Sequence, residues 1–121
     1  MRKIFIAMFM FVSSFGTNVM ADGHSIKMGI ILGFTGPIES LTPAMAASAE
    51  LAFKEASDSG SLLGGKKISA IRADSTCVDS AAATAAAEGV ISQGVAAIMG
   101  ADCSGVTGAI ASNEAVPNGA V

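Results

Sequence analysis

The chain has 121 residues, a formal net charge of −3, and 51% apolar residues. This length allows one domain with a buried core but not two domains. An acidic chain without clusters of lysine or arginine lacks the positive surface that neutralises phosphates, so we expect no nucleic-acid partner.

The first 21 residues have the pattern of a secretory signal peptide. Two basic residues precede an almost entirely apolar run at residues 4–15, and Val19-Met20-Ala21 has the small-x-small character of a cleavage site. The apolar run is well short of the roughly 20 residues that span a bilayer, so we favour a cleaved leader over an uncleaved anchor. We expect residues 1–21 to be the leader and the exported chain to begin at Asp22, with five basic residues against all ten acidic ones.

The exported part shows a series of strand patterns. Nearly continuous apolar runs at residues 26–32 and 95–99 are typical of strands buried on both faces, whereas the alternating residues 67–73 indicate a strand nearer a sheet edge. Residues 120–121 resemble the start of a fourth strand. Helix patterns separate these strands, and alternating strands and helices with short crossovers predict the α/β class with a doubly wound parallel sheet.

Three helices are expected between the strands. Thr42 is the predicted N-cap of the first, with Pro43 at its first position. The second begins at Asp79 or Ser80 and runs to Gln93, and the third can be capped by Ser104 and is broken by residues 116–119. Apolar residues at helical spacing predict the buried faces of the three helices: Met45, Ala49, Ala52, Phe53 and Ala56; Ala83, Ala87, Val90 and Ile91; Val106, Ile110 and Ala111.

The two cysteines follow consecutive predicted strands. Cys77 comes after the strand at residues 67–73, and Cys103 comes after the strand at residues 95–99. The carboxyl ends of parallel strands share one edge, where ligands bind in open α/β sheets. In an exported protein such a pair favours a disulfide. A metal site is the alternative, which lacks further ligands because the only histidine, His24, lies near the start of the exported chain.

Several motifs occur together in a characteristic order. They are the strand at residues 26–32 followed by Gly33-x-Thr35-Gly36-Pro37, then residues 49–52, residues 63–68, residues 74–79 around Cys77, and Gly100-x-x-Cys103-Ser104. In this order and spacing the chain resembles the leucine/isoleucine/valine-binding family, the periplasmic substrate-binding proteins of amino-acid ABC transporters.

The resemblance implies a periplasmic receptor with two lobes that close on a small zwitterion, a branched-chain or related amino acid, and deliver it to an ABC permease in the inner membrane. Residues 22–121 would form the first segment of lobe 1 of this type I binding-protein fold, without a cofactor. Family members similar to this chain bridge the cysteines carried here by Cys77 and Cys103. The ligand-contacting serine of the family matches Ser104, and the backbone around Asp102 and Cys103 would line the same cleft. Leu41 stands where members often carry an aromatic side chain.

Other interpretations of these residues remain open. Ser104 can be a plain helix N-cap, and the Asp102 side chain can orient its loop or face water, of which we favour water. Asp74 could match the ribose-binding acid of a dinucleotide fold, but the glycine pattern is incomplete and the spacing is about twice too long, which favours loop solvation or a turn-capping role. Thr35 and Gly36 have turn chemistry first and line the cleft second.

Catalysis has little support in the sequence. Ser104 lacks the preceding glycine of a nucleophile elbow, and no histidine is placed to serve as its base. We therefore expect a binding protein and not an enzyme. Two alternatives to a transport receptor are a sensory ligand-binding domain of the same fold and a secreted dinucleotide-dependent enzyme.

Overall fold

The computed structural model of the protein describes residues 25–120. The expected leader at residues 1–21 lies outside this range. The elements in chain order are β1 (Ser25–Leu32), α1 (Thr42–Asp58), the 3-10 turn η1 (Leu62–Gly64), β2 (Lys67–Asp74), α2 (Ser80–Ile91), β3 (Ala97–Gly100), α3 (Ser104–Ile110), the π-helical turn η2 (Ala111–Ala115) and α4 (Val116–Asn118).

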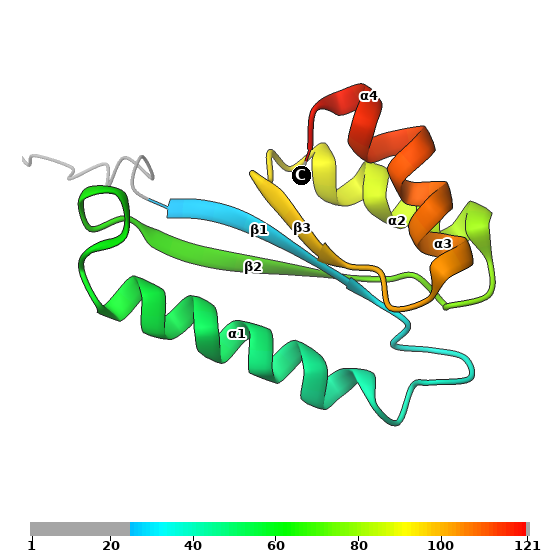
Figure 1. The fold of residues 1–121 in the computed structure, drawn as a ribbon, viewed down its shortest axis with the longest axis horizontal. Helices are drawn as coiled ribbons and strands as arrows, with labels where there is room; N and C mark the ends of the chain where they lie inside the picture. Colours follow the sequence, from blue (N-terminus) through cyan, green and yellow to red (C-terminus); the bar gives the residue numbers. More distant parts are fainter. Residues whose placement is uncertain (1–24, 121) are drawn as a thin grey trace, which may run out of the picture.

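The three strands form one parallel sheet in the order β2-β1-β3 (Figure 1). Helix α1 covers one face of this sheet, and α2, α3 and α4 lie on the other (Figure 1). The predicted α/β fold with a parallel sheet and helices on both faces is confirmed. In residues 25–120, β2 is an edge strand, as its alternating pattern predicted.

The carboxyl half of β1 joins two hydrophobic clusters. Ile31 packs with Ala87 and Val106 on the α2 and α3 side, and Ile30 and Leu32 pack with Ala46 on the α1 side. The side chains of these three β1 residues are at most 1% exposed. Since successive strand residues point to opposite faces, an unbroken apolar run at this position fills both layers of the core.

The sequence predicted part of the buried face of α1 correctly. Ala49, Phe53 and Ala56 are partly buried, as predicted. Met45 is 43% exposed and Ala52 is exposed, whereas the buried Ala46 was not predicted. Thr42 is not the N-cap either, because that position belongs to Leu41, which makes no side-chain capping bond. Alanines occur on several sides of this helix, so two neighbouring stripes both have helical spacing and the sequence could not separate them.

The second and third helices differ from the prediction mainly at their ends. Asp79 caps α2 by accepting hydrogen bonds from the backbone N–H groups of Ala81 and Ala82, at 2.9 and 3.0 Å. This helix ends at Ile91, earlier than the predicted Gln93. After α3 the helical path continues through η2 and α4 and ends at Asn118, within the predicted break at residues 116–119.

Two features explain how the chain stays helical past residue 116. Pro117 lies in the first turn of α4, where its missing N–H costs least, directly after the wider π-helical turn. The helix ends at Gly119, whose φ of +67° is the left-handed conformation typical of a helix C-terminus. Ala120 is not in a strand, and the expected fourth strand otherwise falls on Val121, outside the described residues.

None of the helices within residues 25–120 has the length and apolar character needed to cross a bilayer.

Candidate functional site

The loops that follow the three strands meet at one edge of the sheet. We call this the strand-end rim and define it as residues 33–41, 75–79 and 101–104. The registers Leu32 with Asp74 and Ile31 with Gly100 bring the three carboxyl ends level. This is the edge at which open parallel sheets bind ligands.

A disulfide joins two of the three loops of the rim. Cys77 and Cys103 are bonded, with their Cα atoms 5.2 Å apart, which confirms the predicted bridge. The alternative of a metal site is not supported, because residues 25–120 contain no group of three or more side chains suited to hold a metal ion.

Asp74, at the end of β2, holds the turn that follows β1. Its Oδ1 accepts hydrogen bonds from the N–H groups of Thr35 at 3.3 Å and Thr76 at 2.8 Å, and its Oδ2 accepts one from the Thr35 hydroxyl at 2.5 Å. Burial raises the pKa of Asp74, but the hydrogen bonds from Thr35 and Thr76 together outweigh burial and hold this pKa below its ordinary value. The predicted turn-capping role is therefore confirmed, and the carboxylate is occupied by its own chain.

Gly36 is required by the same turn. Its φ is +95°, and a Cβ added there would lie 2.5 Å from the carbonyl oxygen of Thr76. Both the conformation and the close approach exclude a side chain. The prediction that Thr35 and Gly36 serve the turn first is confirmed.

The expectation that the Asp102 side chain faces water is wrong. Its Oδ2 accepts a hydrogen bond from the N–H of Gly33 at 2.8 Å, and its Oδ1 lies 3.5 Å from the hydroxyl oxygen of Ser75. Gly33 and Ser75 are both buried. A buried N–H group needs an acceptor, and the carboxylate of Asp102 supplies it. The sequence could not reveal this bond, because 69 positions separate its two partners.

Ser104 is the first residue of α3 and is exposed. The N-cap position belongs to Cys103, so Ser104 is not the N-cap that the sequence analysis left open. Leu41 lies at the other end of the rim, at the start of α1, with 61% of its surface exposed. Both side chains are therefore accessible, and their contact with a ligand remains a prediction.

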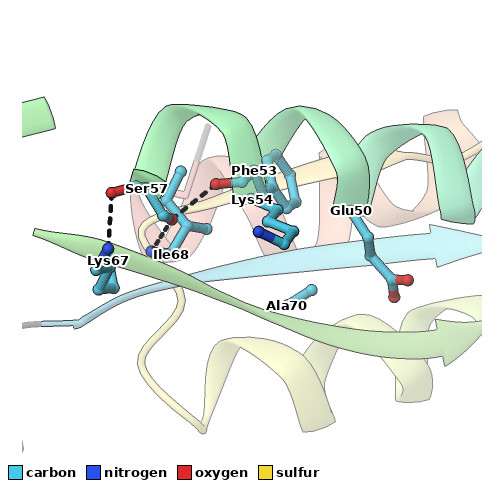
Figure 2. A pocket seen from close by; sticks show the side chains of 7 residues that line it. All are labelled: Glu50, Phe53, Lys54, Ser57, Lys67, Ile68 and Ala70. Carbon is cyan, nitrogen blue, oxygen red and sulfur yellow. Dashed lines mark hydrogen bonds between the residues drawn. The ribbon is translucent and has the colours of Figure 1, made fainter. Parts of the chain in front are cut away.

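A hollow of about 280 Å³ lies away from the rim, between α1 and the first half of β2. Figure 2 shows its lining residues, Glu50, Phe53, Lys54, Ser57, Lys67, Ile68 and Ala70. Ile68 is paired with Ile26 near the amino ends of β2 and β1, at the opposite end of the sheet from the rim. The sequence analysis did not predict this hollow, since its walls come from separate elements.

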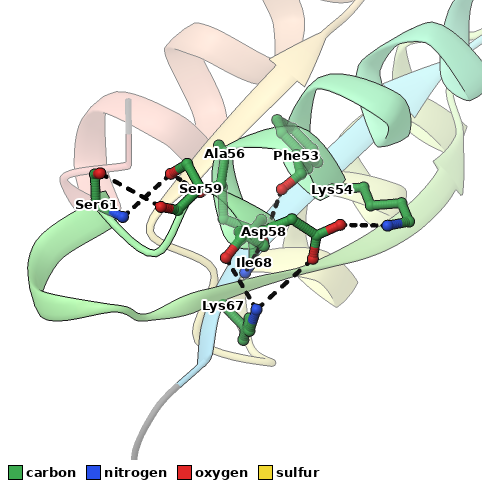
Figure 3. A network of polar contacts seen from close by, with 9 residues as sticks. Phe53, Lys54, Ala56, Asp58, Ser59, Ser61, Lys67 and Ile68 are labelled. Carbon is green, nitrogen blue, oxygen red and sulfur yellow. Dashed lines mark hydrogen bonds and ion pairs between the residues drawn. The ribbon is translucent and has the colours of Figure 1, made fainter.

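The charged groups beside the hollow near the end of α1 are engaged with one another (Figure 3), and Glu50 pairs with Arg72. Asp58 forms ion pairs with Lys54 and Lys67, and Lys67 also donates to the carbonyl oxygen of Ser57 at 2.9 Å. The hydrogen bond from Lys54 is the main reason why the pKa of Asp58 is lowered. These contacts fasten the end of α1 to the start of β2 and give the hollow a structural explanation.

A match between the sequence and the profile of a protein family identifies the family of the chain. Residues 25–116 match the profile described as periplasmic binding protein. The chain belongs to this periplasmic binding protein family. The match begins at the first residue of β1 and ends at the first residue of α4, so it includes the whole strand-end rim. The resemblance drawn from the motifs is confirmed. No curated protein sequence matches the chain.

Two solved structures resemble this periplasmic binding protein segment. One is the branched-chain amino acid transporter substrate binding protein LivJ from Streptococcus pneumoniae in complex with isoleucine, at 28% identity and a TM-score of 0.69. The alignment covers 79% of this chain and 27% of that one. The other is an ABC transporter from Rhodopseudomonas palustris, at 23% identity and a TM-score of 0.69, with 79% and 29% covered; it supports the fold alone. The chain thus spans less than a third of the length of either protein.

Proposed function

We propose that this chain forms part of an extracytoplasmic solute-binding protein that captures a small zwitterion, a branched-chain or related amino acid, for an ABC importer. The observation that carries the proposal is the family match over residues 25–116, together with the likeness to a binding protein solved with isoleucine. The role is binding and delivery, without catalysis.

The ligand contacts proposed in this segment lie on the strand-end rim. The hydroxyl group of Ser104 donates to the carboxylate of the amino acid, and the backbone at Asp102 and Cys103 lines the same cleft. Leu41 offers an exposed apolar surface to the side chain of the ligand. Support comes from the accessibility of Ser104 and Leu41 and from the disulfide that holds Cys103 in place.

The remaining parts of the proposal concern the whole protein. Residues 1–21 act as a cleaved leader, the mature protein works in the periplasm, and a permease of the inner membrane is its partner. Residues 22–121 supply the first segment of the first lobe, and a second lobe closes on the ligand. The small share of the solved relatives that the chain spans supports this division.

The test begins with the native protein purified from its host. Intact mass under non-reducing conditions gives the extent of the mature protein and its disulfide, and calorimetric titration with isoleucine, leucine and valine then measures affinity. We expect Ser104→Ala to weaken binding by about 10- to 100-fold, because a hydrogen bond to a charged group is worth roughly 1.5–3 kcal/mol.

Ser92→Ala is the matched control, since Ser92 is an exposed serine at the far end of α2. It should leave affinity unchanged. If the native protein binds none of the three amino acids at millimolar concentration, the proposed ligand class is wrong. If Ser104→Ala binds as tightly as the unaltered protein, the assignment of this serine is wrong.

A further inference from the structure

We infer that Asp102 is a positioning residue of the strand-end rim: its carboxylate fixes the loop after β1 against the loop after β3 and thereby sets the place of Ser104. The inference rests on the proposed function, because it concerns the same ligand site. It assigns Asp102 a role through its neighbours in place of direct contact between its side chain and the ligand.

The first step of the argument is the environment of Gly33. This residue is buried and lies directly beyond β1, whose pairing with β3 ends at Ile31 with Gly100. Its N–H donates to Asp102 at 2.8 Å, and its carbonyl oxygen accepts from the Thr42 hydroxyl at 3.0 Å. Side chains from two distant segments therefore satisfy both backbone groups of Gly33, and Asp102 continues the link between β1 and β3 past the end of the sheet.

The second step is that Asp102 also reaches the loop after β2. The Ser75 side chain is fully buried, and its hydroxyl lies 3.5 Å from Oδ1 of Asp102. The N–H of Ser75 donates to the carbonyl oxygen of Leu32 at 2.9 Å. One carboxylate thus faces all three strand ends, and each of its oxygens has a partner within the protein. These contacts explain the place of the carboxylate by its neighbours within the protein.

The third step connects Asp102 to Ser104. Only Cys103 separates the two residues. The hydroxyl group of Thr107, one turn into α3, lies 2.9 Å from the carbonyl oxygens of both Ala101 and Cys103, within hydrogen-bonding distance of each. Residues 101–107 are therefore tied together, and a displacement of Asp102 would carry Ser104 with it.

The disulfide alone does not fix this geometry. It joins the loops after β2 and β3 through Cys77 and Cys103. It forms no covalent link to the β1 loop, although Cys77 packs closely against Gly33 in that loop. Asp102 adds a direct hydrogen bond between the β3 loop and the β1 loop, which are otherwise linked through the β2 loop by Asp74 and the disulfide. Bridge and carboxylate together hold all three loops in one relative position.

The test uses the full chain labelled with ¹⁵N and follows amide hydrogen exchange at Gly33 and the chemical shift of the Ser104 amide. We expect Asp102→Ala to speed exchange at Gly33 by about 10-fold or more, because its N–H loses its acceptor, and to shift the Ser104 resonance. Asp102→Asn keeps an acceptor oxygen of the same reach and should restore most of the protection and the shift.

Asp79→Ala is the control, since it removes a hydrogen-bonding aspartate from the N-cap of α2. It should destabilise α2 without a local change at Gly33 or Ser104. If Asp102→Ala does not fold, Asp102→Glu takes its place, and the displaced carboxylate should still shift both amides. The inference is wrong if hydrogen exchange at Gly33 and the Ser104 chemical shift are unchanged in the alanine or glutamate variant. It is also wrong if Gly33 exchanges as fast in Asp102→Asn as in Asp102→Ala.

A second measurement separates this inference from the proposed function. The exchange experiment contains no ligand, so it still tests the positioning role of Asp102 if the native protein fails to bind isoleucine. If the native protein does bind, Asp102→Ala should weaken isoleucine binding by about 10-fold and Asp102→Asn by much less. Equal losses in the two variants would indicate direct recognition by the charge and would contradict a positioning role.

Discussion

Asp74 shows how one residue can hold a turn and make stability depend on pH. Its pKa is lowered in the folded protein, so its contribution is fully present above the ordinary aspartate pKa and is lost as pH falls through the lower folded value. We expect Asp74→Asn to cost about 1–2 kcal/mol of unfolding free energy at pH 7, because hydrogen bonds from Thr35 and Thr76 weaken. Urea denaturation at pH 7 and at steps below pH 4 measures this difference.

The difference between Asp74→Asn and the unaltered chain should shrink as pH falls, since the native carboxyl becomes protonated too. An equal difference at every pH would show that the charge of Asp74 contributes nothing. The turn-capping role of Asp74 could be anticipated because one of its partners, Thr76, is only two positions away, whereas its bonds to Thr35, 39 positions away, could not. Asp102 was not, because its partners Gly33 and Ser75 come close only when the three strands assemble.

At the scale of elements, the end of α1 is fastened to the start of β2 by Ser57 (Figure 2). The Ser57 side chain is buried, donates to the carbonyl oxygen of Phe53 at 2.7 Å and accepts from the N–H of Ile68 at 2.8 Å. We expect Ser57→Ala to lower the unfolding free energy by about 1–3 kcal/mol, because it leaves the N–H of an edge strand without its partner. Chemical denaturation measures the change.

Ser48→Ala is the matched control on the same helix. Ser48 bonds back to the carbonyl oxygen of Ala44, but it is exposed, so its loss should change stability by less than about 0.5 kcal/mol. Equal effects of the two substitutions would mean that the bond to β2 adds nothing.

Strands were easier to predict than helix faces in this chain. The apolar run at residues 26–32 predicted a strand, and β1 matches it, with its second half buried on both sides. The similar run at residues 95–99 formed a shorter strand, β3, that is only partly buried. Helix α1 contains alanine on several sides, so its sequence left the buried face ambiguous by about one residue. The helix continues to Pro117 through a π-helical turn at residues 111–115, and the sequence of these residues did not predict that turn.

At the scale of the whole molecule, the disulfide is the strongest single constraint on the unfolded chain. Cys77 and Cys103 are 26 positions apart, and closing a loop of this size stabilises the fold by about 3–4 kcal/mol on the chain-entropy account. We expect the double variant Cys77→Ser, Cys103→Ser to unfold at a correspondingly lower urea concentration. The unaltered chain in reductant should behave in the same way, and an unchanged midpoint in both would contradict this prediction.

The sequence predicted a parallel sheet, but it did not predict the order of the strands within it. Alternating strands and helices predicted a parallel sheet, and the cysteines predicted which ends meet. That β1 lies between β2 and β3 depends on how the crossovers pack, which no single segment encodes.

The central place of β1 sets the sequence of events during folding. β1 leaves the ribosome before β2 and β3, and it gains its first neighbour only when residues 67–74 have been made and its second only after residues 97–100. Until then Ile30, Ile31 and Leu32 have no sheet to join. Pairings this distant along the chain form slowly, because the loops between them must close first. The strand that fills both layers of the core therefore stays unpaired the longest, and this interval is when the chain is most exposed to aggregation and most open to capture by a chaperone.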